Sequence, residues 1–433
     1  MRLRSEYDRE ILTLAVPALG ALAAEPLYVL VDTAVVGHLG RPQLAALGVS
    51  AVILSTLFAV FNFLQYGTTA QVGRASGAGQ EEAARRLGAQ ALWLCLGIGA
   101  VLAAAVAALA PRLVELMGAD GEAADYAVSY LRIVAFGLPS AFVALGAQGY
   151  LRGVADLRRP LVILAAGNAV NVVLNVLFVY GLDWGIKGSA AATAVGQTAM
   201  GVAFLVTLLR SAGHQLRPRP VLMRRLLAVG RHIFVRTAAL MSAFALAGAV
   251  VTRFGDAAIA AHQIAFQLWL FLALALDAVA IAGQVLVGRA LGAGQRERAF
   301  DASARMIWLA VYAGVAFAVA LLLLEPVLPR LFTSDELVLD QAAEIWLLFA
   351  LMQPLNGAVF ALDGILIGAS DGPYLAWSMV VSFAVCATLS LAALAFDWGI
   401  VGVWVALVVL ILVRLALMLA RFRGRQWLVT GWA

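Results

Sequence analysis

Twelve apolar runs follow one another along this chain, and each is long enough to cross a membrane as a helix. About 20 residues of α-helix span the roughly 30 Å of hydrocarbon in a bilayer. The runs are continuously apolar rather than alternating, which excludes transmembrane β-strands. The sequence therefore predicts an all-α polytopic membrane protein with twelve transmembrane helices. The predicted spans are residues 11–36, 44–70, 87–110, 123–149, 160–181, 187–210, 226–251, 257–284, 304–324, 340–368, 373–395 and 399–420.

The composition agrees with a chain that lies almost entirely within the bilayer. Apolar residues make up 63% and charged residues 13%, against roughly 45–50% and about 25% in soluble domains. The net charge of +5 lies in short loops, without the basic helix of a nucleic-acid binder. Cys95 and Cys386 lie inside apolar runs, which indicates packing rather than a disulfide or a metal site.

The distribution of Lys and Arg predicts the orientation. The N-terminus, the loops after even-numbered spans and the C-terminus hold, in or near them, 23 of the 30 basic residues; the opposite side holds five. The positive-inside rule then places both termini in the cytoplasm and the protein in the plasma (inner) membrane. The start, "MRLRSEYDRE", is too charged for a cleaved signal peptide, so we expect the first span to be retained.

An internal repeat divides the chain into halves. The stretch "QVGRASGAGQEEAA" (71–84) recurs as "VLVGRALGAGQRERA" (285–299), a shift of 215 residues. The same shift carries Pro139 onto Pro354 and Gly149 onto Gly364, and "DWGIKG" (183–188) recurs as "DWGIVG" (397–402). Six spans separate equivalent positions, so the repeat is parallel and its pseudo-two-fold axis follows the membrane normal. Parallel repeats of this kind are an architecture of transporters.

The repeat predicts the domain organisation. We expect an N-terminal six-helix lobe at 1–211, a cytoplasmic linker at 212–225 and a C-terminal six-helix lobe at 226–433. The Gly-rich loops lack the Gly-Lys-Ser/Thr ending of a phosphate loop, so they are interpreted as turns between spans.

The intramembrane carboxylates do not follow the repeat. The shift carries Glu25 onto Leu240 and Asp32 onto Ala247. A charged side chain in hydrocarbon is costly and usually functional. The two halves are therefore expected to form a symmetric frame that carries an asymmetric site.

Glu25 and Asp32 are the candidates for proton coupling. They are seven residues apart, two helical turns, so they share one face of the first span. Desolvation favours the neutral form of a carboxylate, which suits it to taking up and releasing a proton. Pro17 and Pro26 each remove a helical hydrogen bond, so we expect the span to bend there. The alternative is a structural ion pair with an intramembrane arginine such as Arg132.

A stripe of asparagines marks the fifth span. Asn168, Asn171 and Asn175 are spaced i, i+3 and i+7, on one helical face. Such residues can hold helices together in lipid, or they can face the same cavity as Asp32 and exchange hydrogen bonds with it. Further candidates to line a substrate cavity are Tyr28, Gln65, Thr193 and Gln197.

The second half offers polar candidates of its own, and none forms a zinc-like cluster or a nucleophile–base pair, so no metal, cofactor or enzymatic centre is expected. Asp277 can simply pair with arginines of the next loop, and His262 can be an interface histidine. The candidates are Arg236, His262, Gln267, Asp277 and Asp363.

The repeat, "DTAVVGHLG" after the first span and the paired "VGRASGAGQ" and "VGRALGAGQ" loops resemble the MATE (multidrug and toxic-compound extrusion) transporters, and "EPLYVLVDTAVVGHLG" is most similar to the DinF branch. The resemblance covers nearly the whole chain. It implies that Asp32 is the protonation site and that the first span bends at Pro17. Some relatives carry a second carboxylate where this chain has Asn175. Sodium-coupled members carry acids on spans 7 and 10, where this chain has Arg236 and Asp363, so proton coupling is favoured and sodium is the alternative.

The function that the resemblance implies is secondary antiport. The expected substrates are cationic or amphipathic organic compounds, exported by alternating access against inward H⁺ flow. Export of organic anions or of lipid-linked sugars by the same fold is the close alternative. An intramembrane enzyme and a channel are disfavoured, since the loops lack a catalytic cluster and no segment resembles a selectivity filter. The expected partners are small-molecule substrates and the bilayer, with no nucleic acid and no obligate protein partner.

Overall fold

The computed structural model describes residues 6–212 and 217–432, and every regular element in these ranges is a helix. Within them, eleven helices are long and apolar enough to cross a membrane, and a bent pair supplies a twelfth span. The prediction of an all-α protein with twelve spans is therefore confirmed.

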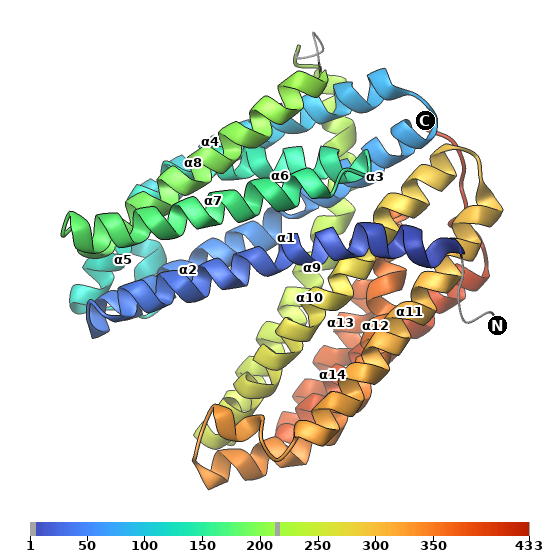
Figure 1. The fold of residues 1–433 in the computed structure, drawn as a ribbon. Helices are drawn as coiled ribbons and strands as arrows, with labels where there is room; N and C mark the ends of the chain where they lie inside the picture. Colours follow the sequence, from blue (N-terminus) through green and yellow to red (C-terminus); the bar gives the residue numbers. More distant parts are fainter. Residues whose placement is uncertain (1–5, 213–216, 433) are drawn as a thin grey trace. The chain divides into compact units, whose positions relative to one another are not determined.

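The elements of the first half include one π-helical segment, η1, at the end of α7. They are α1 (Glu6–Gly37), α2 (Arg41–Phe61), α3 (Phe63–Gly77), α4 (Glu81–Leu116), α5 (Gly121–Ala135), α6 (Leu138–Gly153), α7 (Arg158–Val176), η1 (Leu177–Gly181) and α8 (Gly185–Ala212) (Figure 1).

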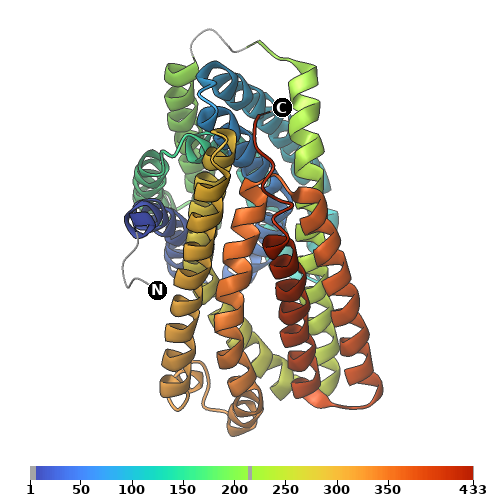
Figure 2. The same cartoon turned by 90° about the vertical axis from the view of Figure 1, so that its right-hand side faces the viewer.

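The second half has fewer and longer helices, with two short 3₁₀ turns. Its elements are α9 (Pro220–Val251), η2 (Thr252–Phe254), α10 (Asp256–Gly292), α11 (Arg296–Leu324), η3 (Pro329–Leu331), α12 (Glu336–Gly368), α13 (Gly372–Ala395) and α14 (Gly399–Arg423). Figure 2 shows these yellow-to-red helices running alongside one another, and α12 packs against α10, α11 and α14.

The chain forms two compact units, and α1 contributes to both. One unit is Gly20–Gly230; the other is Met1–Leu19 together with Arg231–Ala433. The start of α1 is anchored to α11 by two ion pairs. Arg305 Nε lies 2.6 Å from Asp8 Oδ1, and Arg298 Nη2 lies 3.1 Å from Glu10 Oε2. The predicted linker at 212–225 includes residues 213–216, which lie outside the described residues.

The repeated Gly-rich stretches end helices in both halves. Gly79 and Gly294 have φ of +72° and +78°, a region that glycine enters without penalty. The next residues close the turns, because Gln80 N donates to Ala75 O over 3.0 Å and Gln295 N donates to Ala290 O over 2.9 Å. The interpretation of these loops as turns rather than phosphate loops therefore agrees with their geometry.

The equivalent prolines act differently in the two halves. The predicted span at 123–149 is divided into α5 and α6, which meet at 55° just before Pro139. Pro354 lies inside α12, which continues without a break. A proline in a helix removes one hydrogen bond and favours a kink. In the first half the chain bends there, at the junction of α5 and α6.

Candidate functional site

Asp32 is enclosed by neutral hydrogen-bond donors. Its side chain is 4% exposed. Ser189 Oγ donates to Oδ1 over 2.6 Å, the Asn175 amide donates to the same oxygen, and Tyr130 OH donates to Oδ2 over 3.4 Å. The donors come from α8, α7 and α5, so the Asp32 carboxylate connects α1 to three other helices of its unit.

The alternative in which Arg132 neutralises Asp32 is not formed. The Arg132 side chain is exposed and donates instead to the carbonyl of Ala107, at 3.4 Å. Neutral donors stabilise an ionised carboxylate without cancelling its charge. The Asp32 site can therefore exist charged or, after taking up a proton, neutral.

A cavity of about 410 Å³ lies within the Gly20–Gly230 unit, beside this network. The predicted residues Tyr28, Gln65, Asn168, Asn171, Thr193 and Gln197 all line it, together with Glu25. Its volume falls in the range of small-molecule sites, about 300–1,000 Å³.

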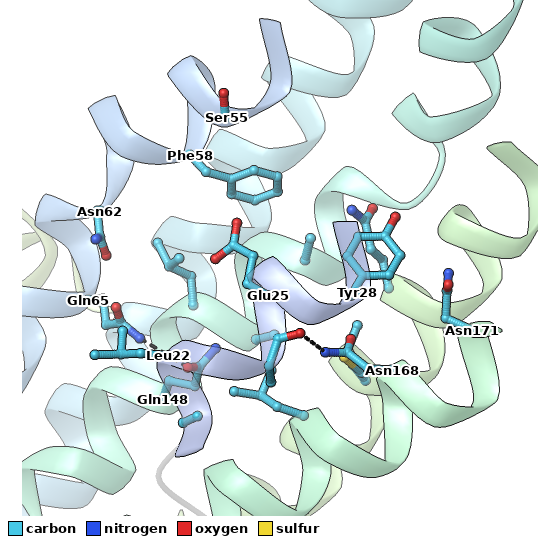
Figure 3. A pocket seen from close by; sticks show the side chains of 18 of the residues that line it. Leu22, Glu25, Tyr28, Ser55, Phe58, Asn62, Gln65, Gln148, Asn168 and Asn171 are labelled. Atoms are coloured by element: carbon cyan, nitrogen blue, oxygen red, sulfur yellow. Dashed lines mark hydrogen bonds between the residues drawn. The ribbon is translucent and has the colours of Figure 1, made fainter. Parts of the chain in front are cut away.

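Hydrogen bonds between neighbouring helices fix several of these walls (Figure 3). Tyr28 OH and Thr193 Oγ1 are 2.9 Å apart and join α1 to α8. Asn168 Nδ2 donates to Ala24 O over 2.8 Å, and Gln65 Nε2 donates to Gln148 Oε1 over 3.2 Å. The three asparagines of α7 therefore lie in two places: Asn168 and Asn171 line the cavity, whereas Asn175 contacts Asp32.

The helix that carries both carboxylates is continuous. α1 runs from Glu6 to Gly37 through Pro17 and Pro26 without interruption (Figure 1). Both prolines are half-buried. Bending of α1 at either proline therefore stays a prediction.

In the other unit, Asp363 is held by two arginines. Arg236 Nε donates to Asp363 Oδ1 over 2.9 Å and its Nη2 contacts Oδ2, while Arg414 Nη2 lies 2.8 Å from Oδ1. Asp363 and Arg414 are buried at 5% and 4% exposure. The cluster ties α9, α12 and α14 together, and a carboxylate held in this way has little capacity left for a sodium ion.

The remaining second-half candidates are dispersed along α10. His262 is buried, stacks on Phe266 with ring centroids 5.7 Å apart, and meets the edge of Trp404. Gln267 is exposed and Asp277 is half-buried. Within the described residues no group of three or more His, Cys, Asp or Glu side chains could hold a metal ion.

Sequence reasoning missed three residues of these clusters. Tyr130 and Ser189 lie on the fourth and sixth predicted spans, and neither stands out as polar in an apolar run. The 23 basic residues that the sequence places on the cytoplasmic side include Arg414, which lies six positions inside the predicted span 399–420. That depth is the signal that could have revealed its buried role.

The duplicated frame of membrane-spanning helices and the internal small-molecule cavity define a multi-pass membrane transporter. A family model described as MatE matches residues 17–177 and 233–394, once in each half. The chain belongs to this family, whose members are transporters and not enzymes.

Relatives and solved structures agree with this assignment. The chain is 33% identical to Protein DETOXIFICATION 44, chloroplastic, of Arabidopsis thaliana, over 94% of this chain and 80% of the relative. It is 30% identical to DNA damage-inducible protein F of Escherichia coli K12, over 100% of this chain and 95% of that one. A structure described as an outward-facing multidrug resistance MATE family transporter has a TM-score of 0.88 at 22% identity, covering 98% of both chains.

Proposed function

We propose that this protein is a proton-coupled antiporter that exports cationic or amphipathic organic compounds. The observation that carries the proposal is Asp32, a buried carboxylate whose partners are all neutral donors and which lies next to a cavity of small-molecule size. Relatives named as probable multidrug resistance proteins, such as NorM of Thermotoga maritima at 24% identity, support export of drug-like compounds.

The proposed cycle uses the charge of Asp32. With Asp32 ionised, an outward-open state holds the substrate cation. A proton from outside neutralises Asp32, the hydrogen bonds from Ser189, Asn175 and Tyr130 rearrange, and α1 bends near Pro17, which releases the substrate. The protein then turns inward, and Asp32 loses the proton to the cytoplasm, where both termini are proposed to lie. Solved MATE structures described as bent and straight, both matching this fold, are consistent with such a change.

Proton coupling is favoured over sodium coupling by the second half of the chain. The acid that could have served a sodium site, Asp363, forms ion pairs with Arg236 and Arg414 instead. Export of organic anions or lipid-linked sugars is disfavoured because the charged side chain exposed in the cavity is a carboxylate, that of Glu25.

The test is efflux of a fluorescent lipophilic cation from proteoliposomes, driven separately by a pH gradient and by a sodium gradient. Wild type and Asp32→Asn are compared side by side. The proposal requires efflux that a pH gradient drives and that the variant loses. Efflux driven by sodium alone, or wild-type rates and proton coupling in Asp32→Asn, would refute it.

A further inference from the structure

The two intramembrane carboxylates of α1, Glu25 and Asp32, have opposite surroundings. Asp32 is 4% exposed and accepts three hydrogen bonds, whereas Glu25 is exposed within the cavity. Across residues 6–212 and 217–432, the Glu25 carboxylate makes no hydrogen bond or ion pair. One helix face therefore carries an enclosed carboxylate and, two turns away, a second one that faces empty space.

The cavity also holds carboxamide oxygens that lack partners. Asn62 Oδ1, Asn171 Oδ1 and Gln197 Oε1 are buried atoms without a hydrogen-bond partner within the described part of the chain, and all three residues line the cavity. Asn171 is only 3% exposed. A buried acceptor without a partner is unfavourable because it has lost its hydrogen bonds to water, so a ligand that donates N–H groups to these oxygens would recover that loss.

Aromatic rings complete the surroundings of Glu25. Figure 3 shows the Glu25 carboxylate directed toward the ring of Phe58, with Tyr28 one turn further along α1. Aromatic faces attract organic cations. A metal ion is disfavoured because Glu25 belongs to no cluster of His, Cys, Asp or Glu side chains in the described residues.

The positive side chain of the cavity offers little to an anion. Arg152 is among the lining residues, but it is 5% exposed and takes part in other interactions. The accessible charge in the cavity is therefore a single negative one.

We propose that this cavity selects monovalent organic cations rich in N–H groups, such as amidinium, guanidinium or primary ammonium compounds. Glu25 supplies the counter-charge, and the free oxygens of Asn62, Asn171 and Gln197 accept the N–H groups. A quaternary ammonium ion carries the positive charge that pairs with Glu25, but it has no N–H group to donate to the carboxamide oxygens. A neutral amide can donate N–H groups to these oxygens but carries no charge to pair with Glu25. The inference rests on the proposed export of organic cations, while leaving the proton to Asp32.

Binding to the purified full-length protein tests the proposal without any gradient, so its outcome is independent of transport. Calorimetric titrations would compare three probes of similar size: benzamidinium, phenyltrimethylammonium and neutral benzamide. We expect wild type to bind benzamidinium at least tenfold more tightly than either of the others, since hydrogen bonds between charged groups are stronger than neutral ones.

Variants separate the two components of recognition. Glu25→Gln should weaken benzamidinium binding about tenfold and leave benzamide unchanged, and Glu25→Asp should retain most of the affinity. Asn171→Leu should weaken benzamidinium but not phenyltrimethylammonium. Glu115→Gln, the same change at an exposed residue of α4 outside the cavity, is the matched control and should have no effect.

Three results would overturn the proposal. The first is equal affinity for benzamidinium and phenyltrimethylammonium in wild type. The second is unchanged benzamidinium binding in Glu25→Gln, and the third is no binding of any probe. Should Glu25→Gln instead abolish proton-driven transport as completely as Asp32→Asn while binding all probes normally, Glu25 would belong to proton coupling and not to substrate selection.

Discussion

Ser189 donates its hydroxyl to Oδ1 of Asp32 over 2.6 Å, from the second turn of α8 to the last third of α1. The bond is charge-assisted when Asp32 is ionised and must weaken when the carboxylate takes up a proton. A single side-chain contact thus links the protonation state of α1 to the position of another helix.

Removing that donor should move the pH dependence of transport. In Ser189→Ala the ionised form of Asp32 loses one hydrogen bond, so the carboxylate should keep its proton to higher pH. A hydrogen bond to a charged group contributes about 1.5 kcal/mol or more, and 1.36 kcal/mol corresponds to a shift of one pH unit. We therefore expect the midpoint of the pH profile of proton-driven efflux to rise by about one unit. Ser50→Ala, a buried serine whose hydroxyl bonds within α2 to Ala46 O, is the control. A profile identical in Ser189→Ala and wild type would contradict this role.

The Asp363 cluster should be structural and insensitive to sodium. Asp363→Asn leaves Arg236 and Arg414 buried without their counter-charge, and removing one side of a buried ion pair typically costs about 3–5 kcal/mol. We expect a clearly lowered midpoint of thermal unfolding in detergent, whereas Arg330→Met, at an exposed pair with Glu336, should change it little. Adding sodium chloride in place of potassium chloride should leave the wild-type midpoint unchanged. A higher midpoint in sodium chloride than in potassium chloride would instead indicate that Asp363 binds sodium.

Gly364 should be intolerant of any side chain. A Cβ atom there would collide with the backbone carbonyl of Ala280 in α10, so Gly364→Ala forces α10 and α12 apart. Overpacking of this kind costs about 1–3 kcal/mol, and the thermal midpoint should fall. Gly97→Ala in α4, where a Cβ meets no atom within 4 Å, should be neutral or slightly stabilising. Equal behaviour of the two variants would argue against close contact at Gly364.

The pairing of Asp8 with Arg305 should be recoverable by exchange of charges. Asp8→Arg and Arg305→Asp each place like charges together and should lower the rate of efflux or the thermal midpoint. The double exchange restores opposite charges at the same place and should recover much of the loss. A double variant no better than either single one would show that this ion pair does not act as a unit.

The spans could be predicted because lipid imposes a single requirement on every one of them. An apolar stretch of about 20 residues has almost no alternative to a helix in hydrocarbon. The breaks within spans were not predicted, since Pro139 follows a break and Pro354 does not, although both occupy the same repeat position. The difference is decided by the packing of neighbouring helices, which the local sequence does not contain.

The candidate site was predictable where a polar side chain stood out against an apolar run. Asp32, Glu25 and the asparagines of α7 are conspicuous for that reason. Tyr130 and Ser189 are not, because tyrosine and serine are ordinary in membrane helices and their importance arises only from the helix they face. Arg414 was misplaced because a basic residue near the end of a span is normally a surface charge.

The membership of α1 in two units has a consequence for how the chain can be divided. The backbone passes between the units twice, at Leu19–Gly20 and at Gly230–Arg231. A cut in the stretch 213–216 would therefore not yield two self-contained halves. The N-terminal fragment would retain Asp8 and Glu10, whose partners Arg305 and Arg298 lie in the other fragment. Co-expressed fragments would have to reassemble through the beginning of the first helix, so a split version of this transporter would depend on residues 6–19 for its reconstitution.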